Sequence, residues 1–245
     1  MDAVIGTAGW SIASKNADAF AAEGSALERY SRVFGGVEIN SSFHRPHRAS
    51  TWAKWAASVP EGFRFSAKIP KTITHQAKLV GSEALVEQFI QDVKPLGDKL
   101  AVLLVQLPPK LGFEGQVAER FFTHLRGVTG ADLACEPRNQ SWFHPQADAL
   151  LAALRVARVA ADPAVVPAAA VPGGWLGLAY WRLHGSPAMY RSAYEDAVLD
   201  KHAREIAAVL EAGRSAWCMF DNTAASEATG NALSLIARIQ ALGPR

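Results

Sequence analysis

The sequence predicts an α/β fold, a single (β/α)8 (TIM) barrel that spans residues 1–245 and has a short or irregular sixth helix. Strand-like apolar runs alternate with helix-like segments along the whole chain, a pattern typical of parallel strands joined by helices. The length of 245 residues is close to the about 250 residues usual for such barrels. No glycine-rich phosphate loop follows a strand, so the alternative, an open doubly wound sheet, is less favoured.

The first half of the chain predicts four strand–helix pairs. Val37 and Ile39 alternate with Glu38 and Asn40, and this period of two places the apolar and polar pairs on opposite faces of a strand. Residues 63–69 alternate in the same way. The eight elements, a strand and then a helix each time, are expected at residues 4–10, 25–34, 37–40, 49–59, 63–69, 82–93, 101–107 and 114–125.

The second half continues the alternation with one interruption. Strands are expected at residues 132–136, 156–162, 179–185 and 216–221, and helices at residues 147–154, 199–213 and 231–242. Residues 163–174 hold three prolines and two glycines, which are poor helix formers. We therefore expect the sixth helix to be short or missing.

Composition and charge exclude several classes of protein. With 25 basic and 23 acidic residues, the net charge is +2, too small to indicate nucleic-acid binding by itself. Cys135 and Cys218 lie in apolar runs, so we expect reduced, buried thiols. The chain opens without a signal-peptide pattern and has no apolar run near the ~20 residues of a membrane span, so a cytoplasmic protein without membrane contact is expected.

Polar side chains stand where nearly every predicted strand ends. In a barrel these ends meet at one mouth, where charged groups lose hydration and must pair with one another or with a ligand. Two interpretations stay open: structural ion pairs such as Glu38–Lys68 and Glu136–Arg182, or a binding site. The residues concerned are Glu38, Asn40, Lys68, Gln106, Glu136, Arg138, Asp162, Arg182, His184, Asp221 and Asn222.

Basic and aromatic residues lie just beyond the strand ends. Guanidinium and ammonium groups that converge on a pocket suit phosphate or carboxylate, although a solvated basic loop is the alternative. The basic set is His44, Arg45, His47, Arg48, Lys71, His75, Arg138 and Arg191. The aromatic set, expected to wall the pocket, is Trp10, Phe43, Trp142, Phe143, Tyr190 and Tyr194.

A metal centre is a minor alternative. Glu38, Glu136, Asp162, His184 and Asp221 are of the residue types that bind divalent cations. However, the sequence has no HExxH or CxxC motif, and the neighbouring basic residues of the strand ends would compete for the carboxylates. No cofactor is predicted.

Nine ordered motifs resemble those of the DUF72 (YecE-like) family. The resemblance covers nearly the whole chain and implies a TIM barrel, but it implies no particular reaction. Two motifs depart from the usual pattern, with Asn139 in place of a histidine and Asp221 in place of an asparagine. The motifs are GTAGW at 6–10, VEINSSF at 37–43, FRFSAK at 63–68, TH at 74–75, QLPP at 106–109, EPR at 136–138, SW at 141–142, RLHG at 182–185 and FDN at 220–222.

The leading hypothesis is an enzyme, a hydrolase, lyase or isomerase, that acts on a small phosphate- or carboxylate-bearing substrate. Glu38 and Glu136 would act as general acid and base, and His184 would move a proton or donate to an oxyanion. Lys68, Arg138 and Arg182 would hold the anion. The remaining residues expected to contact substrate are Asn40, His44, Arg45, His75, Gln106, Asp221, Asn222, Trp10 and Tyr190. The alternatives are a nucleic-acid-binding or nucleic-acid-processing protein and a non-catalytic scaffold.

Overall fold

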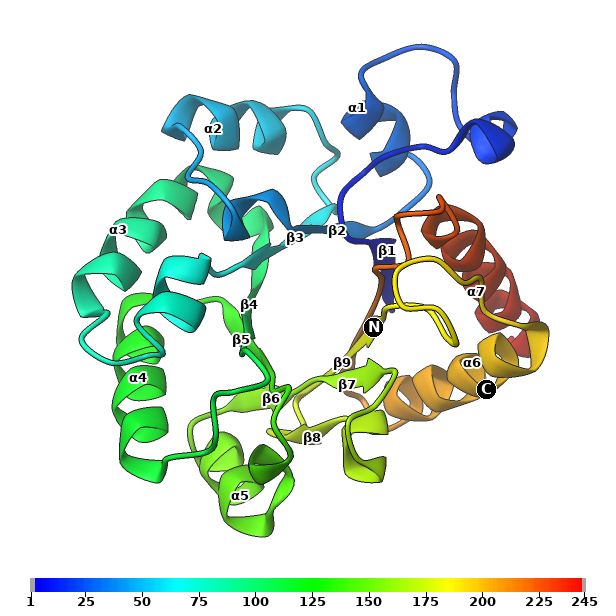
Figure 1. The fold of residues 1–245 in the computed structure, drawn as a ribbon. Coiled ribbons are helices and arrows are strands. Elements are labelled where there is room, and N and C mark those ends of the chain that lie inside the picture. Colours follow the sequence, from blue (N-terminus) through cyan, green and yellow to red (C-terminus); the bar gives the residue numbers. More distant parts are fainter. Residues whose placement is uncertain (1–2, 244–245) are drawn as a thin grey trace.

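The computed structural model describes residues 3–243, in which parallel strands are surrounded by helices (Figure 1). The strands are β1 (Val4–Thr7), β2 (Gly36–Ile39), β3 (Arg64–Lys68), β4 (Leu100–Gln106), β5 (Asp132–Glu136), β6 (Val156–Arg158), β7 (Ala160–Asp162), β8 (Gly173–Gly174), β9 (Leu178–Leu183) and β10 (Ser215–Phe220). The α-helices are α1 (Ala26–Ser31), α2 (Ala49–Ala57), α3 (Glu83–Val93), α4 (Gly115–Val128), α5 (Pro145–Ala153), α6 (Asp196–Glu211) and α7 (Ala228–Leu242). Short helical turns are η1 (Ser14–Ala19), η2 (Ser41–Phe43), η3 (Thr72–Gln76), η4 (Lys94–Lys99), η5 (Gln140–Phe143) and η6 (Pro167–Ala170).

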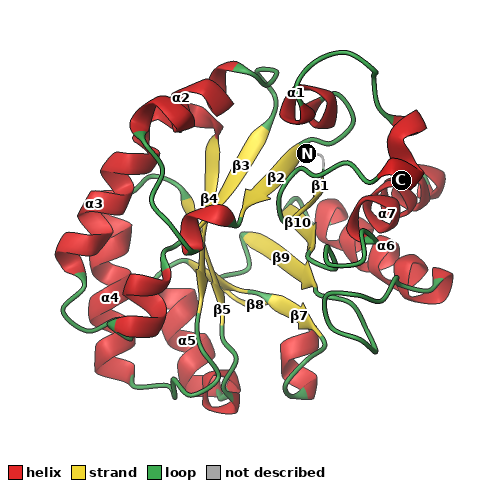
Figure 2. Cartoon of the chain, turned by 45° about the horizontal axis from the view of Figure 1, so that its top comes forward, coloured by secondary structure: helices red, strands yellow, loops and turns green. Residues whose placement is uncertain are grey.

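The strands form two sheets that meet at two places. The sheet orders are β1-β10-β9-β7 and β2-β3-β4-β5-β6-β8. At one meeting point Ala8 bridges to Glu38, and the Gly9 amide donates to the Glu38 carbonyl at 2.8 Å. At the other, consecutive strands β6 and β7 belong to different sheets, and the Val159 amide between them donates to the Cys135 carbonyl at 2.8 Å. The result is a TIM-barrel-like arrangement (Figure 2).

Glycine allows the close approach of β1 and β2. A Cβ atom on Gly6 would lie 2.2 Å from the carbonyl oxygen of Gly36, which is far inside van der Waals contact. Gly9 has a positive φ of 86°, which only glycine adopts readily. Strand β1 therefore ends at Thr7, and the segment 4–10 closes in a bend at Gly9, just before Trp10, which agrees with the sequence.

The two faces of the strands pack against different cores. Leu103 and Val105 belong to the larger cluster, which also contains buried helix residues, while Val102 and Leu104 belong to a smaller cluster with Tyr180. Because side chains alternate along a strand, the smaller cluster fills the face that the helices do not cover. The charged residues described below continue this inner face toward the carboxyl ends of the strands.

The structure confirms the predicted order of strands and helices, and it also confirms the weak sixth helix. Between β7 and β9 the chain forms only the turn η6 and the two-residue strand β8, which pairs antiparallel with β6. Cys135 and Cys218 are buried free thiols, as expected. Among the helices built from residues 3–243, none is long and apolar enough to cross a membrane.

Candidate functional site

Arg182 on β9 is the centre of a buried charged cluster. Its Nε donates to Glu38 Oε2 at 2.9 Å and its Nη2 donates to Glu38 Oε1 at 2.6 Å. The same side chain donates to Glu136 Oε2 at 2.6 Å and to Asp221 Oδ2 at 3.1 Å. A planar guanidinium group suits this two-point contact with a carboxylate. Arg182 thereby connects the ends of β2, β5 and β10 across the inner face.

His184 lies between two carboxylates in the same cluster. Its Nδ1 is 3.0 Å from Asp221 Oδ2, and its Nε2 is 2.8 Å from Glu136 Oε1. Arg138 Nη2 is 2.7 Å from both Glu136 Oε1 and His184 Nε2. With a carboxylate near each ring nitrogen and the Arg138 guanidinium also near Nε2, the imidazole is held in a fixed orientation inside the cluster.

The cluster keeps two of its carboxylates ionised. Burial alone would raise the pKa of Glu136, but the charges of Arg182, Arg138 and His184 hold it well below its usual range. Burial likewise opposes ionisation of Asp221, whose pKa is lowered by Arg182 and by its contact with His184. Near neutral pH these groups therefore act as fixed negative charges that position the basic residues.

Tyr180 is a member of the cluster that the sequence analysis missed. Its hydroxyl donates to Glu38 Oε2 at 3.0 Å and lies 3.1 Å from Ser66 Oγ. Burial and the charge of Glu38 raise its pKa well above the usual value, so the phenol stays protonated. The period of two along β9 places Tyr180 on the same face as Arg182. Because Tyr180 stands among apolar residues of the strand, nothing in the sequence indicated that its hydroxyl would join the charged cluster.

Lys68 on β3 is the exception to the internal pairing. It forms no direct ion pair with any residue in the described range 3–243. Of the two ion pairs considered from the sequence, Glu136–Arg182 is present, whereas Glu38 pairs with Arg182 and not with Lys68. The Lys68 side chain is only 6% exposed, and its Nζ lies 4.1 Å from the centre of the Phe43 ring. Burial and the charge of Arg182 lower the pKa of Lys68 to about 8.

Other predicted residues lie around this cluster. Tyr190 packs edge-on against the His184 ring, with 5.6 Å between ring centres. His75 packs edge-on against Phe43 at 4.9 Å, and burial and the Lys68 charge lower its pKa. Asn40 and Gln106, at the ends of β2 and β4, are half-buried. The Asn40 Oδ1 atom is buried and has no hydrogen-bond partner within residues 3–243.

Some predicted residues serve the scaffold. Asn222 is buried and donates to Asn231 Oδ1 at 2.8 Å, and Trp10 packs on Trp55 at 5.1 Å. Trp142 is buried, its indole nitrogen donates to the Leu111 carbonyl at 3.0 Å, and its side chain lines a separate cavity beside Leu111. Asp162 accepts a hydrogen bond from Tyr194 at 2.7 Å.

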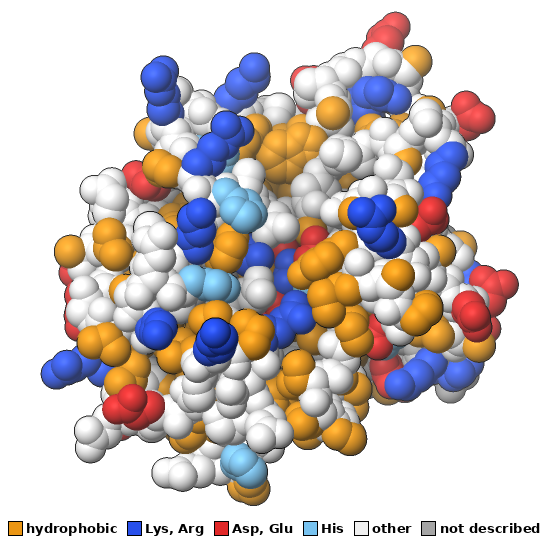
Figure 3. Space-filling view, in the orientation of Figure 1, with side chains coloured by type: hydrophobic (Ala, Val, Ile, Leu, Met, Phe, Trp, Pro, Cys, Tyr) orange, Lys and Arg blue, Asp and Glu red, His pale blue; other side chains and the backbone are white. Residues whose placement is uncertain are grey.

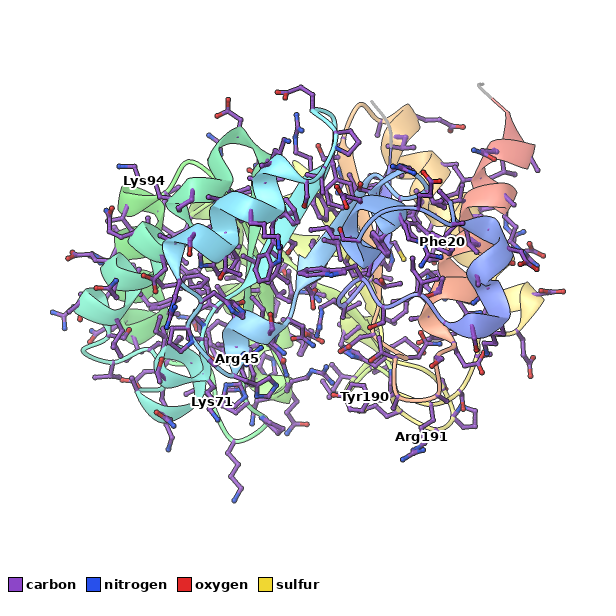
Figure 4. All side chains as sticks on the ribbon, turned by 90° about the horizontal axis from the view of Figure 1, so that it is seen from above. Phe20, Arg45, Lys71, Lys94, Tyr190 and Arg191 are labelled. Carbon is purple, nitrogen blue, oxygen red and sulfur yellow. The ribbon has the colours of Figure 1, made fainter. Side chains whose placement is uncertain are left out.

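The surface above the cluster is hollowed and basic. Figure 3 shows a hollow at the centre of this face, with basic side chains gathered in and around it. His44 and Arg45 are exposed, and Figure 4 places Arg45, Lys71, Tyr190 and Arg191 on the same side of the molecule. Arg45, Lys71 and Arg191 form no ion pairs with residues 3–243, so this rim carries positive charge that its own side chains do not neutralise.

The donor set does not favour a metal. Within the described part of the chain, no group of three or more histidine, cysteine or acidic side chains is arranged to hold a metal ion. The guanidinium of Arg182 lies among Glu38, Glu136 and Asp221, where a cation bound by these carboxylates would have to lie.

These features define a TIM-barrel-like α/β protein with a buried charged cluster at the carboxyl ends of its strands. The chain belongs to the DUF72 family: the family model described as "Protein of unknown function DUF72" matches residues 4–244.

Relatives of known sequence and structure agree with this assignment. The chain is 34% identical over 86 residues to UPF0759 protein YecE of Escherichia coli (strain K12), covering 35% of this chain and 32% of YecE. It is 31% identical over 151 residues to UPF0759 protein YunF of Bacillus subtilis (strain 168), covering 58% of this chain and 52% of YunF. These alignments span about a third and about half of the two relatives.

Two crystal structures of DUF72 proteins share the fold. The protein from Enterococcus faecalis V583 superposes with a TM-score of 0.82 at 20% identity, covering 98% of this chain and 96% of that protein. The protein from Thermotoga maritima MSB8 gives a TM-score of 0.79 at 21% identity, covering 98% of this chain and 100% of that protein.

Proposed function

We propose that this protein is an enzyme that acts on a small phosphate- or carboxylate-bearing substrate by proton transfer at the hollow above the charged cluster. The observation that carries the proposal is Lys68, a buried ammonium that forms no direct ion pair with the described residues, although the charges of Glu38, Glu136 and Asp221 act on it. Burial lowers the pKa of Lys68 despite these carboxylates, and an anion in direct contact would stabilise its charged form. The unpaired charges of the rim would attract the same anion.

Lys68 and His184 are the proton-transfer groups in this proposal. A pKa of about 8 leaves Lys68 populated in both protonation states near neutral pH, as general acid–base chemistry requires. Glu136, expected from the sequence to act as acid or base, stays ionised and orients His184 and Arg138. Glu38 is held by Arg182 and Tyr180, which suits an electrostatic and positioning role.

The proposal treats the chain as one domain whose two sheets close into an eight-stranded barrel. Support comes from the Ala8–Glu38 bridge on one side and the continuous segment 156–162 on the other. Closure would place Glu38, Lys68 and Asp221 around one mouth. Active sites of (β/α)8 enzymes lie at this end of the strands.

Calorimetric titration with a panel of phosphorylated and carboxylated metabolites tests the proposal, and turnover of any ligand that binds is then measured. Lys68→Met should weaken binding at least about tenfold, since hydrogen bonds between charged groups contribute about 1.5–3 kcal/mol. Lys94→Met is the matched control, because Figure 4 shows Lys94 away from the side that carries Arg45 and Lys71. Turnover should be lost in Glu38→Gln. The proposal fails if nothing in the panel binds, or if Lys68→Met binds as well as wild type.

The basic rim also favours a second candidate, binding of a nucleic acid. Arg45, Lys71 and Arg191 are free to contact phosphates without breaking an ion pair to the described residues. Such binding should weaken steeply with added salt. Absence of binding to single- and double-stranded oligonucleotides in a fluorescence-anisotropy titration would exclude this candidate. The non-catalytic scaffold is the outcome if neither metabolites nor nucleic acids bind.

A further inference from the structure

A cavity lies beside the charged cluster, and Arg45 and Lys71 of the basic rim belong to its lining. It has a volume of about 200 Å³ and lies between the loop after β2, the beginning of η3 and one face of α3. Its walls are mainly aromatic and apolar, and include Phe43, His47, Trp52, Leu85 and Phe89. Small-molecule sites usually have about 300–1,000 Å³, so this cavity suits one ring of a ligand.

Phe43 connects this cavity with the charged cluster. Its ring lines the cavity and also lies 4.1 Å from the Lys68 ammonium. An anion held by Lys68 would therefore lie close to Phe43, which also lines the cavity. The two regions are neighbours that share one wall.

The polar groups of the cavity suit a ring that carries heteroatoms and is joined to an anion. Arg45 and Lys71 are among the lining residues and form no ion pair within residues 3–243. Gln88 donates to Asp92 at 2.9 Å on the α3 wall, which presents hydrogen-bonding groups to the edge of a ring. The buried indole nitrogen of Trp52 has no partner within that range.

We propose that this cavity is a subsite for a planar heteroaromatic ring, and that the substrate is a ring-bearing phosphate ester of the size of a nucleoside monophosphate. This inference rests on the proposed function, because Lys68 and the rim hold the phosphate. The cavity would select among anions by stacking and packing against the ring, since aromatic walls bind the faces of bases.

Calorimetric titrations separate the ring from the phosphate. Adenosine and uridine 5′-monophosphate are compared with ribose 5-phosphate, which has the same phosphate and sugar without a ring. At least one nucleotide should bind about tenfold or more tightly than ribose 5-phosphate. Leu85→Trp should abolish this difference by filling the cavity while binding of ribose 5-phosphate stays unchanged.

Two further variants are needed, one that adds a side chain outside the cavity and one that obstructs the cavity from another position. Ala84→Trp places the same side chain at an exposed neighbour on α3 that does not line the cavity, and it should bind like wild type. Gln88→Trp obstructs the cavity from a second exposed position, in case Leu85→Trp is poorly folded, and it should also abolish the nucleotide preference.

The possible negative results distinguish failure of the ring subsite from failure of the anion site. If ribose 5-phosphate binds as tightly as both nucleotides, or if the cavity variants keep the nucleotide preference, the subsite is refuted and the anion site stands. If the cavity variants weaken ribose 5-phosphate as much as the nucleotides, the subsite is also refuted. If neither kind of phosphate binds, nor any other anion of the metabolite panel, the proposed function fails and the subsite fails with it.

Discussion

Replacement of Arg182 by methionine should be the most destabilising single change in the cluster. It removes a guanidinium that makes four hydrogen bonds to Glu38, Glu136 and Asp221. Removing one partner of a buried ion pair costs about 3–5 kcal/mol. For a chain of this size each kcal/mol lowers Tm by about 2–4 °C, so even about 3 kcal/mol corresponds to a decrease of about 6–12 °C at pH 7.

The loss should depend on pH in a definite direction. A carboxylate whose pKa is lowered in the folded protein stabilises the fold above its unfolded pKa, and this contribution disappears as the pH falls through the folded pKa. Glu136 and Asp221 both have lowered pKa values, and without Arg182 their protonation becomes easier. The difference in Tm between wild type and Arg182→Met should therefore shrink between pH 7 and pH 4.

Thermal unfolding followed by circular dichroism at both pH values measures this effect. Arg191→Met serves as the control, because Arg191 forms no ion pair with residues 3–243 and its loss should change Tm little. A decrease in Tm below about 2 °C for Arg182→Met at pH 7 would refute the reasoning. A decrease of the same size at pH 7 and pH 4 would refute the electrostatic part of it.

Three further predictions test individual members of the cluster. Tyr180→Phe removes one hydrogen bond to the Glu38 carboxylate and should cost about 1.5–3 kcal/mol, measured by urea denaturation; an unchanged midpoint would contradict the assigned contact. Competitive labelling of Lys68 with acetic anhydride, read by mass spectrometry, should be half-maximal near pH 8, and a midpoint near the ordinary lysine value of 10.5 would contradict its burial. Asp221→Asn cannot lose a stabilising negative charge in acid, so its Tm should fall less steeply than that of wild type below pH 4; parallel curves would show that Asp221 carries no such contribution.

The order of strands and helices could be predicted because it depends on local patterns. Alternation at residues 37–40 and the apolar run at residues 101–107 indicate strands whatever the rest of the chain does. The weak sixth helix was predictable for the same reason, since its prolines and glycines oppose helix formation locally. Only finer breaks were missed, such as the division of the predicted strand 156–162 into β6 and β7.

The pairing inside the cluster could be predicted only in part. The sequence suggested Glu136–Arg182, which is present, and Glu38–Lys68, which is not. In the structure Arg182 reaches Glu38 across the inner face from β9, in the other sheet. Contacts across the interior depend on side-chain length and strand tilt, which the spacing of residues along the chain does not contain.

The division of the cluster between the two sheets has a consequence for assembly. Arg182 and Asp221 come from the sheet that contains β9 and β10, whereas Glu38, Lys68 and Glu136 come from the other. A partly folded molecule that keeps only one sheet would expose charges whose counterparts are elsewhere. The cluster is therefore complete only when both sheets are in place.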